Sequence, residues 1–127
     1  MDLADLKRKA EAAREYTVQA AGCTFTCRLP TPSEAELELA RAYRTEQAEL
    51  AVMLRVQRAL LERVVVSWSG VTQAMLAPGA TDEPAEVSPD AVALLLDADP
   101  EVSEALHQAF VARSRERQQR KAAAEKN

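Results

Sequence analysis

The chain has 127 residues, the length of one domain, and a formal net charge of −4. Apolar residues make up 47% of it but aromatic residues only 4%, which favours a modest core built mainly from small side chains. No apolar run reaches the ~18 residues of a membrane-spanning helix. The charged N-terminus also lacks the apolar stretch of a secretory signal peptide, so we expect a protein of the cytoplasm in which it is made.

The first elements are predicted to be a helix and a β-hairpin. Residues 3–14 are rich in Ala, Lys, Arg and Glu, which favour helix. In residues 16–29 apolar and polar side chains alternate on both sides of Gly22, the pattern of two antiparallel strands. A lone hairpin is marginally stable, so its apolar face must pack against a helix or a second copy of the chain.

The two cysteines lie in the second predicted strand. Cys23 and Cys27 share one strand face but would be roughly 13 Å apart, which is too far for a disulfide. No His or further Cys lies near them in the sequence to complete a zinc site. We therefore predict two buried, reduced cysteines that pack in the core.

Thr31-Pro32-Ser33-Glu34 has the features of a helix start, with a Thr cap, Pro at the first helical position and Glu three residues after the cap. Because no Gly or Pro follows until after Val66, we predict a long central helix over residues 32–66, with a break at 44–49 as the alternative. Such a helix would be about 50 Å long. A domain this small cannot cover it, so part of its apolar face is expected to meet a partner.

Residues 64–71, VVVSWSGV, are predicted to end the central helix. The valines lower helix propensity, the serines and glycine favour a turn, and Trp68 would anchor that turn on the helix. Neither serine has a base nearby in the sequence, and the only histidine, His107, is far along the chain. We therefore expect no catalytic role for this segment.

The rest of the chain is predicted to be a loop, two short helices and a tail. Residues 72–87 contain two prolines, a glycine and several acidic residues, which is typical of a loop. Ser88-Pro89 and Asp99-Pro100 begin two helices. The expected fold class is mainly α with a small β-hairpin (α+β), with one α-rich domain over residues 1–112 and a basic, partly disordered tail over 113–127.

Acidic and basic residues are segregated along the C-terminal third. Residues 81–104 contain eight acidic residues and no basic one, and residues 113–126 contain six basic and two acidic residues. This polarity either steers a partner or a second copy, or belongs to a solvated face and a solvated tail. Binding to nucleic acid is disfavoured by the acidic net charge and by the lack of aromatic residues in the tail.

No pattern in the sequence indicates catalysis. It contains no phosphate-binding loop, no dinucleotide-binding glycines, no Cys/His metal set and no nucleophile–base pair. We expect a protein that is not an enzyme and that uses no cofactor or metal.

The order of motifs resembles a known family. An extended segment ends in Leu29-Pro30, and a long charged helix leads into Trp68-Ser69-Gly70-Val71 and an acidic loop. A helix then starts at Val87-Ser88-Pro89-Asp90 with a leucine run, and a Pro-capped helix ends in a charged tail at Lys126-Asn127. Over about residues 25–127 this order resembles the tail assembly chaperones of long-tailed bacteriophages.

The resemblance implies a non-enzymatic protein of the host cytoplasm that is not expected in the mature virion. Such chaperones bind the tape measure protein, keep it soluble, and help to recruit tail tube subunits. We expect a homo-oligomer that makes no contact with a membrane. The alternative is a structural helical adaptor, such as a minor tail or head–tail joining component, and a weaker one is a nucleic-acid-associated protein.

Two groups of residues are the candidate partner-binding surfaces. Apolar residues of the central helix and its end are candidates for the core and the client-facing surface: Leu50, Met53, Leu54, Leu61 and Trp68. Basic residues of the tail are candidates for contacts with other copies or with tube subunits: Arg113, Arg115, Arg117, Arg120 and Lys121.

Overall fold

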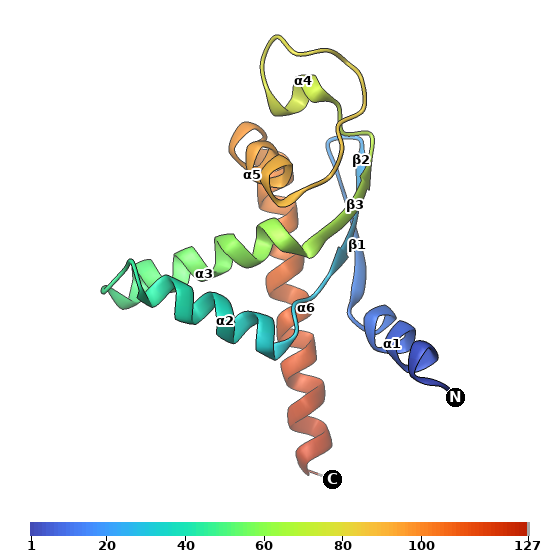
Figure 1. Cartoon of the computed structure of the whole chain (residues 1–127), viewed down its shortest axis with the longest axis vertical. Coiled ribbons are helices and arrows are strands. Elements are labelled where there is room, and N and C mark those ends of the chain that lie inside the picture. The colour runs from blue at the N-terminus through green and yellow to red at the C-terminus, as the bar shows by residue number, and fades with distance from the viewer. Residues whose placement is uncertain (127) are drawn as a thin grey trace.

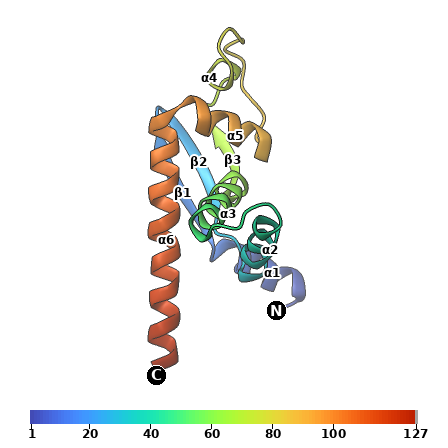
Figure 2. The same cartoon turned by 90° about the vertical axis from the view of Figure 1, so that its left-hand side faces the viewer.

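A computed structural model describes residues 1–126 and confirms the α+β fold class, with about 63% of the chain in helices. Over these residues it contains six helices and one three-stranded antiparallel sheet in the order β1-β2-β3. The sheet lies at the centre, and the long helix α6 (Pro100–Lys126) runs past it (Figure 1). The helical pair α2–α3 projects away from the sheet, as the two views show (Figures 1 and 2).

The predicted hairpin is confirmed. It follows α1 (Leu3–Ala12) and consists of β1 (Glu15–Ala20) and β2 (Cys23–Arg28), which pair in register from Glu15↔Arg28 to Ala20↔Cys23. Ala21 and Gly22 form the two-residue turn, both with positive φ (52° and 76°). Such a turn matches the twist of the two strands, and Gly22 adopts its φ without steric cost.

The prediction that the helix ends in residues 64–71 is confirmed, since α3 ends at Val64, but the predicted turn is wrong, because most of these residues form β3 (Val65–Ser69). This strand pairs antiparallel with β2, with Phe25 opposite Trp68. The valines that lower helix propensity favour a strand once β2 offers its free edge. Gly70 follows with φ +88°, and a Cβ at this position would lie 3.1 Å from the carbonyl oxygen of Gly22, so the strand end passes close to the hairpin turn.

Trp68 anchors the segment that follows β3. Its ring meets Phe25 edge-on, with centroids 6.3 Å apart and planes at 83°. Its indole N–H donates a hydrogen bond of 2.8 Å to the carbonyl oxygen of Ala85. The aromatic anchor predicted from the sequence is therefore present, but it holds the strand to the loop rather than to the end of a helix.

The prediction of one long central helix is also wrong, and the alternative with a break at 44–49 is confirmed. The chain forms α2 (Pro32–Tyr43) and α3 (Glu49–Val64). The predicted capping box at Thr31 and Glu34 is present. At the break, the Arg55 side chain donates hydrogen bonds to Thr45 Oγ1 and to the carboxylate of Glu46, so α3 holds the turn that precedes it.

After β3 come the short helix α4 (Gln73–Leu76), a loop, α5 (Pro89–Ala98) and α6. The predicted caps are confirmed: Ser88 Oγ accepts from the N–H of Ala91 at 3.0 Å, and Asp99 accepts from that of Val102 at 3.2 Å. The expected partly disordered tail is instead a continuation of α6 to Lys126, because Ala, Arg, Gln, Lys and Glu are strong helix formers. Asn127 lies outside the described residues.

The core lies between the sheet, the inner end of α3, α5 and α6. Its most completely buried side chains include Phe25, Cys27, Val71, Val92, Leu95, Val102 and Leu106. Both cysteines are free and buried, as predicted. Burial raises the pKa of the Cys27 thiol to about 12, so this thiol stays protonated at neutral pH.

Candidate functional site

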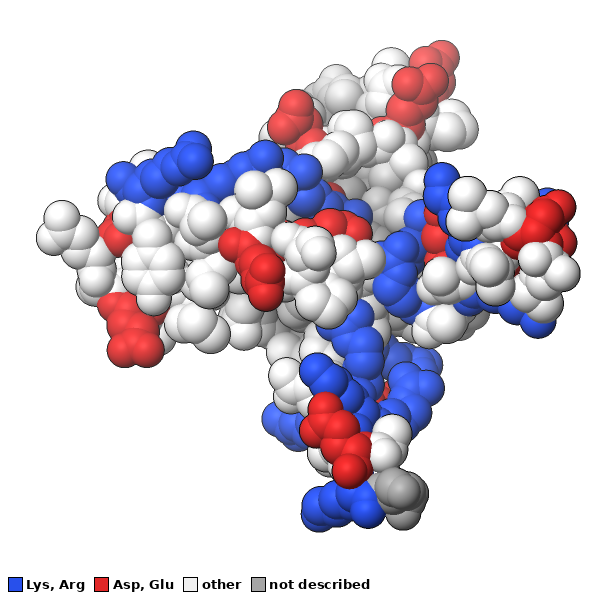
Figure 3. Space-filling model, turned by 60° about the horizontal axis from the view of Figure 1, so that its bottom comes forward, with Lys and Arg blue, Asp and Glu red and all other residues white. Residues whose placement is uncertain are grey.

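Helices α2 and α3 form an antiparallel pair, here called the arm (residues 32–64), which extends beyond the core. The two helices meet through small or buried side chains, among them Ala42 and Val52, which are 3% and 0% exposed. In Figure 3, Lys and Arg side chains line one edge of the arm, and the surface beside them is mostly uncharged.

One apolar stripe runs along α3 and is covered over only half its length. Leu50, Leu54 and Leu61 recur at spacings of four and seven residues, which places them on one helical face. At the inner end, Leu61 is 4% exposed and packs in the core. At the outer end, Leu50, Met53 and Leu54 are 72%, 51% and 58% exposed. The stripe continues past the core because the arm is longer than the core is wide.

The structure therefore divides the five apolar candidates into two groups. Leu61 and Trp68 serve the core or its margin, whereas Leu50, Met53 and Leu54 remain as an exposed surface. Sequence reasoning missed three exposed apolar residues of α2, Leu37, Leu39 and Tyr43. The four-residue spacing of Leu39 and Tyr43 was an available signal, since it places them on one face of α2.

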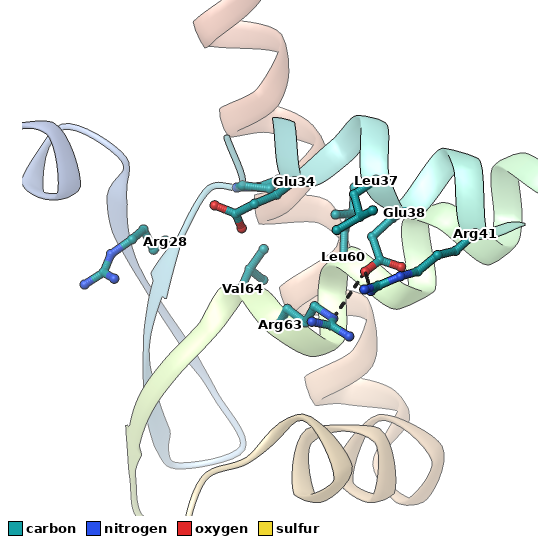
Figure 4. Close-up of a pocket in the computed structure, with 9 residues that line it drawn as sticks. Arg28, Glu34, Leu37, Glu38, Arg41, Leu60, Arg63 and Val64 are labelled. Carbon is teal, nitrogen blue, oxygen red and sulfur yellow. Dashed lines mark hydrogen bonds and ion pairs between the residues drawn. The ribbon is translucent and has the colours of Figure 1, made fainter. Parts of the chain in front are cut away.

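A small pocket lies where the arm joins the sheet (Figure 4). Glu38 is 8% exposed, and its Oε1 accepts a hydrogen bond of 2.8 Å from Arg41 and lies 3.5 Å from Nε of Arg63. The two arginines compensate the buried carboxylate and tie α2 to α3. The pocket measures about 100 Å³ and is lined by Arg28, Pro30, Glu34, Leu37, Glu38, Arg41, Leu60, Arg63 and Val64.

This pocket is far smaller than the ~300–1,000 Å³ of a typical small-molecule site. Its polar groups are already engaged, since Glu38 is paired with Arg41 and Arg63. We therefore assign it a structural role in setting the angle of the arm, and the candidate functional surface is the outer part of the arm.

The basic candidates divide in the same way. Val102, Leu106 and Phe110 form the buried stripe of α6, and the next positions on that face are Arg113 and Arg117. The Arg113 guanidinium lies 5.9 Å from the centroid of the Tyr16 ring, an attractive cation–π arrangement. Arg117 donates a hydrogen bond of 2.7 Å to the carbonyl oxygen of Pro30. These two residues fix α6 to the hairpin and to the base of the arm.

The other three basic candidates point to solvent. Arg115, Arg120 and Lys121 are exposed, and none of them has an ion-pair partner within residues 1–126. Figure 3 shows basic side chains gathered on this end of α6. They remain the candidate basic surface.

Over residues 1–126, no group of three or more His, Cys, Asp or Glu side chains could hold a metal ion. None of the helices in this range has the length and apolar character needed to cross a membrane. Comparisons of the chain with protein-family models, with curated proteins and with solved structures find no match.

Proposed function

We propose that this chain is a tail assembly chaperone of a long-tailed phage, and that the outer part of the arm holds an apolar segment of the tape measure protein. The observation that carries the proposal is the uncovered half of the α3 stripe, Leu50, Met53 and Leu54. Large apolar side chains on one helical face mark a protein-binding surface when no core covers them.

The size of this surface suits reversible binding. Fully burying a Leu or Met side chain contributes about 1.5–3 kcal/mol, and these three are half to three-quarters exposed. Covering all three would contribute about 3–5 kcal/mol, roughly a hundred- to several-thousand-fold in affinity. One copy then holds its client weakly. Several copies on one long client hold it firmly, and each can still leave.

The expected client segment is an amphipathic helix that lays its apolar residues along the arm, as in other helix-on-helix recognition. The basic residues of α6 (Arg115, Arg120 and Lys121) are the proposed contact with tail tube subunits or with other copies. On this proposal the protein acts in the host cytoplasm, performs no catalysis, and leaves before the virion is complete.

Co-expression with the tape measure protein tests the proposal. We expect the tape measure protein to be soluble with the wild-type chain and to precipitate with the variant L50S/M53S/L54S. The matched control is L3S/L6S/L94S, which removes three apolar side chains of similar exposure (73%, 53% and 52%) outside the arm. Circular dichroism of each variant checks that it remains folded.

Equal solubility with the arm variant would refute the role of the arm. A tape measure protein that precipitates with the wild-type chain would refute the chaperone function itself. The second candidate is a structural adaptor, favoured by the long, rigid α6 with its exposed basic end. An adaptor would be found in purified phage particles at fixed stoichiometry, whereas a chaperone would be absent from them.

A further inference from the structure

The two ends of α6 lie in regions of opposite charge. Residues 81–112 contain eight acidic residues and no Lys or Arg, whereas residues 113–126 contain six basic and two acidic residues. The 27 residues of α6 span about 40 Å at 1.5 Å per residue. Figure 1 shows α5 and the α4 loop beside the start of this helix and the basic segment at its far end.

The acidic end consists of exposed carboxylates: Asp82, Glu83, Glu86, Asp90 and Glu101. None of them has an ion-pair partner within residues 1–126. The other three carboxylates of the region have internal roles, since Asp97 pairs with Arg58 at 2.9 Å, Asp99 caps α6, and Glu104 accepts a hydrogen bond of 3.0 Å from Gln108. The five exposed carboxylates therefore take no part in the ion pairs and caps that stabilise the fold.

The basic end consists of Arg115, Arg120 and Lys121, which are likewise exposed and without an ion-pair partner in the described part of the chain. It is held in place, because Arg113 and Arg117 fix the preceding turns of α6 to Tyr16 and to Pro30. A rigid helix presents its charges at a defined position, so binding them costs less conformational entropy than binding a disordered tail.

We propose that copies of this chain associate head to tail, with the basic end of one copy on the acidic end of the next. The two ends carry opposite charges, so the basic end of one copy is complementary to the acidic end of another. Both ends are present at the same concentration, because every copy has one of each. A polyanion such as DNA is a poorer occupant of the basic end, because the net charge of the protein is −4.

The two surfaces are different and lie at opposite ends of the molecule. Two antiparallel copies that make both contacts at once form a closed two-fold dimer, whereas a contact made at one end only is heterologous and repeats from copy to copy. The result is a ring if the rotation closes and an open row if it does not. This inference requires no client and stands independently of the chaperone function.

The test is sedimentation of the purified chain at several protein concentrations in low and in high salt. At about 0.01 M ionic strength the Debye length is ~30 Å, and at about 1 M it is ~3 Å. We expect species heavier than the 13.9 kDa monomer that grow with concentration at low salt, and the monomer alone at high salt.

Charge reversal identifies the two surfaces. The variant R115E/R120E/K121E and the variant D82K/E83K/E86K should each lose association by at least about tenfold, because like charges then face each other. Mixed together, the two variants should associate again, because the first then has two acidic ends and the second has two basic ends. The variant R115Q/R120Q/K121Q should also weaken association and avoids added repulsion. The control K7E/K9E/R44E lowers the net charge by the same amount as R115E/R120E/K121E, at exposed positions elsewhere, and should associate like the wild type.

Three outcomes would overturn the proposal: a wild-type chain that stays monomeric at low salt, reversal variants that associate unchanged, or a mixture of the two that does not associate. A salt-dependent shift of duplex DNA by the monomer, abolished in R115E/R120E/K121E, would assign the basic end to nucleic acid instead and would also overturn it.

Discussion

Replacing Leu61 and, separately, Leu54 by alanine tests whether the stripe of α3 is covered at one end and open at the other. Leu61 is 4% exposed, so Leu61→Ala leaves a cavity in the core and should lower the free energy of unfolding by about 2–5 kcal/mol. Leu54 is 58% exposed, so Leu54→Ala loses less than half of that burial. Alanine is also a slightly better helix former, and the expected loss is about 1 kcal/mol or less.

Urea unfolding measures both effects. Trp68 is the only tryptophan, and its place in the sheet makes its fluorescence a reporter of the core. With a denaturant slope of about 2 kcal/mol/M, Leu61→Ala should move the midpoint by about 1–2.5 M and Leu54→Ala by less than about 0.5 M. Equal shifts would show that Leu54 is covered in solution and that the outer part of the stripe is not open. A small shift for Leu61→Ala would show that the inner part of the stripe is not packed in the core.

Three further predictions concern single groups. The Tyr16 hydroxyl is buried and has no hydrogen-bond partner within residues 1–126 other than a weak contact with the Cys27 thiol, so Tyr16→Phe should be neutral or stabilising by up to about 1 kcal/mol in urea unfolding; a clear loss would show that this contact is a strong hydrogen bond. Trp68→Phe removes the 2.8 Å hydrogen bond to Ala85, and should cost about 1 kcal/mol and speed proteolysis of the 72–87 loop; an unchanged cleavage rate would contradict the anchor. Burial raises the pKa of Cys27 from 9.0 to about 12, so the unfolded chain releases this proton first. The free energy of unfolding should then be independent of this thiol below pH ~9 and fall by about 1.4 kcal/mol per pH unit above it, with a shallower fall in Cys27→Ala.

Much of the fold follows from local signals in the sequence. The alternation around Gly22 predicted the hairpin, and Thr31, Ser88 and Asp99, each followed by Pro, predicted three helix starts that the structure confirms. These features depend on residues within a few positions of one another. Their physical basis is hydrogen bonding of the first free N–H groups of a helix and the period of a strand.

The incorrect predictions mostly concern segments whose structure depends on residues elsewhere in the chain. Val65 and Val66 fit a helix end as well as a strand, and only the free edge of β2, about 40 residues earlier in the chain, selects the strand. The break between α2 and α3 has no Gly or Pro to mark it, and it is held by Arg55 from the following helix. The tail is a different case, because helix propensity alone already favours a helix there; Arg113 and Arg117 add contacts to Tyr16 and Pro30 that no local pattern indicates.

The sequence predicted which residues form the candidate surfaces, but not which of them are exposed and which hold the fold together. Spacing placed Leu50, Leu54 and Leu61 on one face, but where the core ends along that face depends on how far the arm projects. In the same way, the sequence predicted a basic tail but could not separate the arginines that hold α6 to the fold from those that point to solvent. Both divisions depend on tertiary placement, which a single sequence does not contain.

The arm is an insertion between two strands that are neighbours in the sheet, since β2 ends at Arg28 and β3 begins at Val65. Its outer tip does not contact the sheet and does not affect strand pairing, so the length of the arm can change in evolution separately from the rest of the fold. Seven residues added to each helix keep both helical faces in phase and extend the tip by about 10 Å. Related chains with longer or shorter arms on an unchanged sheet then differ only by a paired insertion or deletion of whole turns, one in each helix.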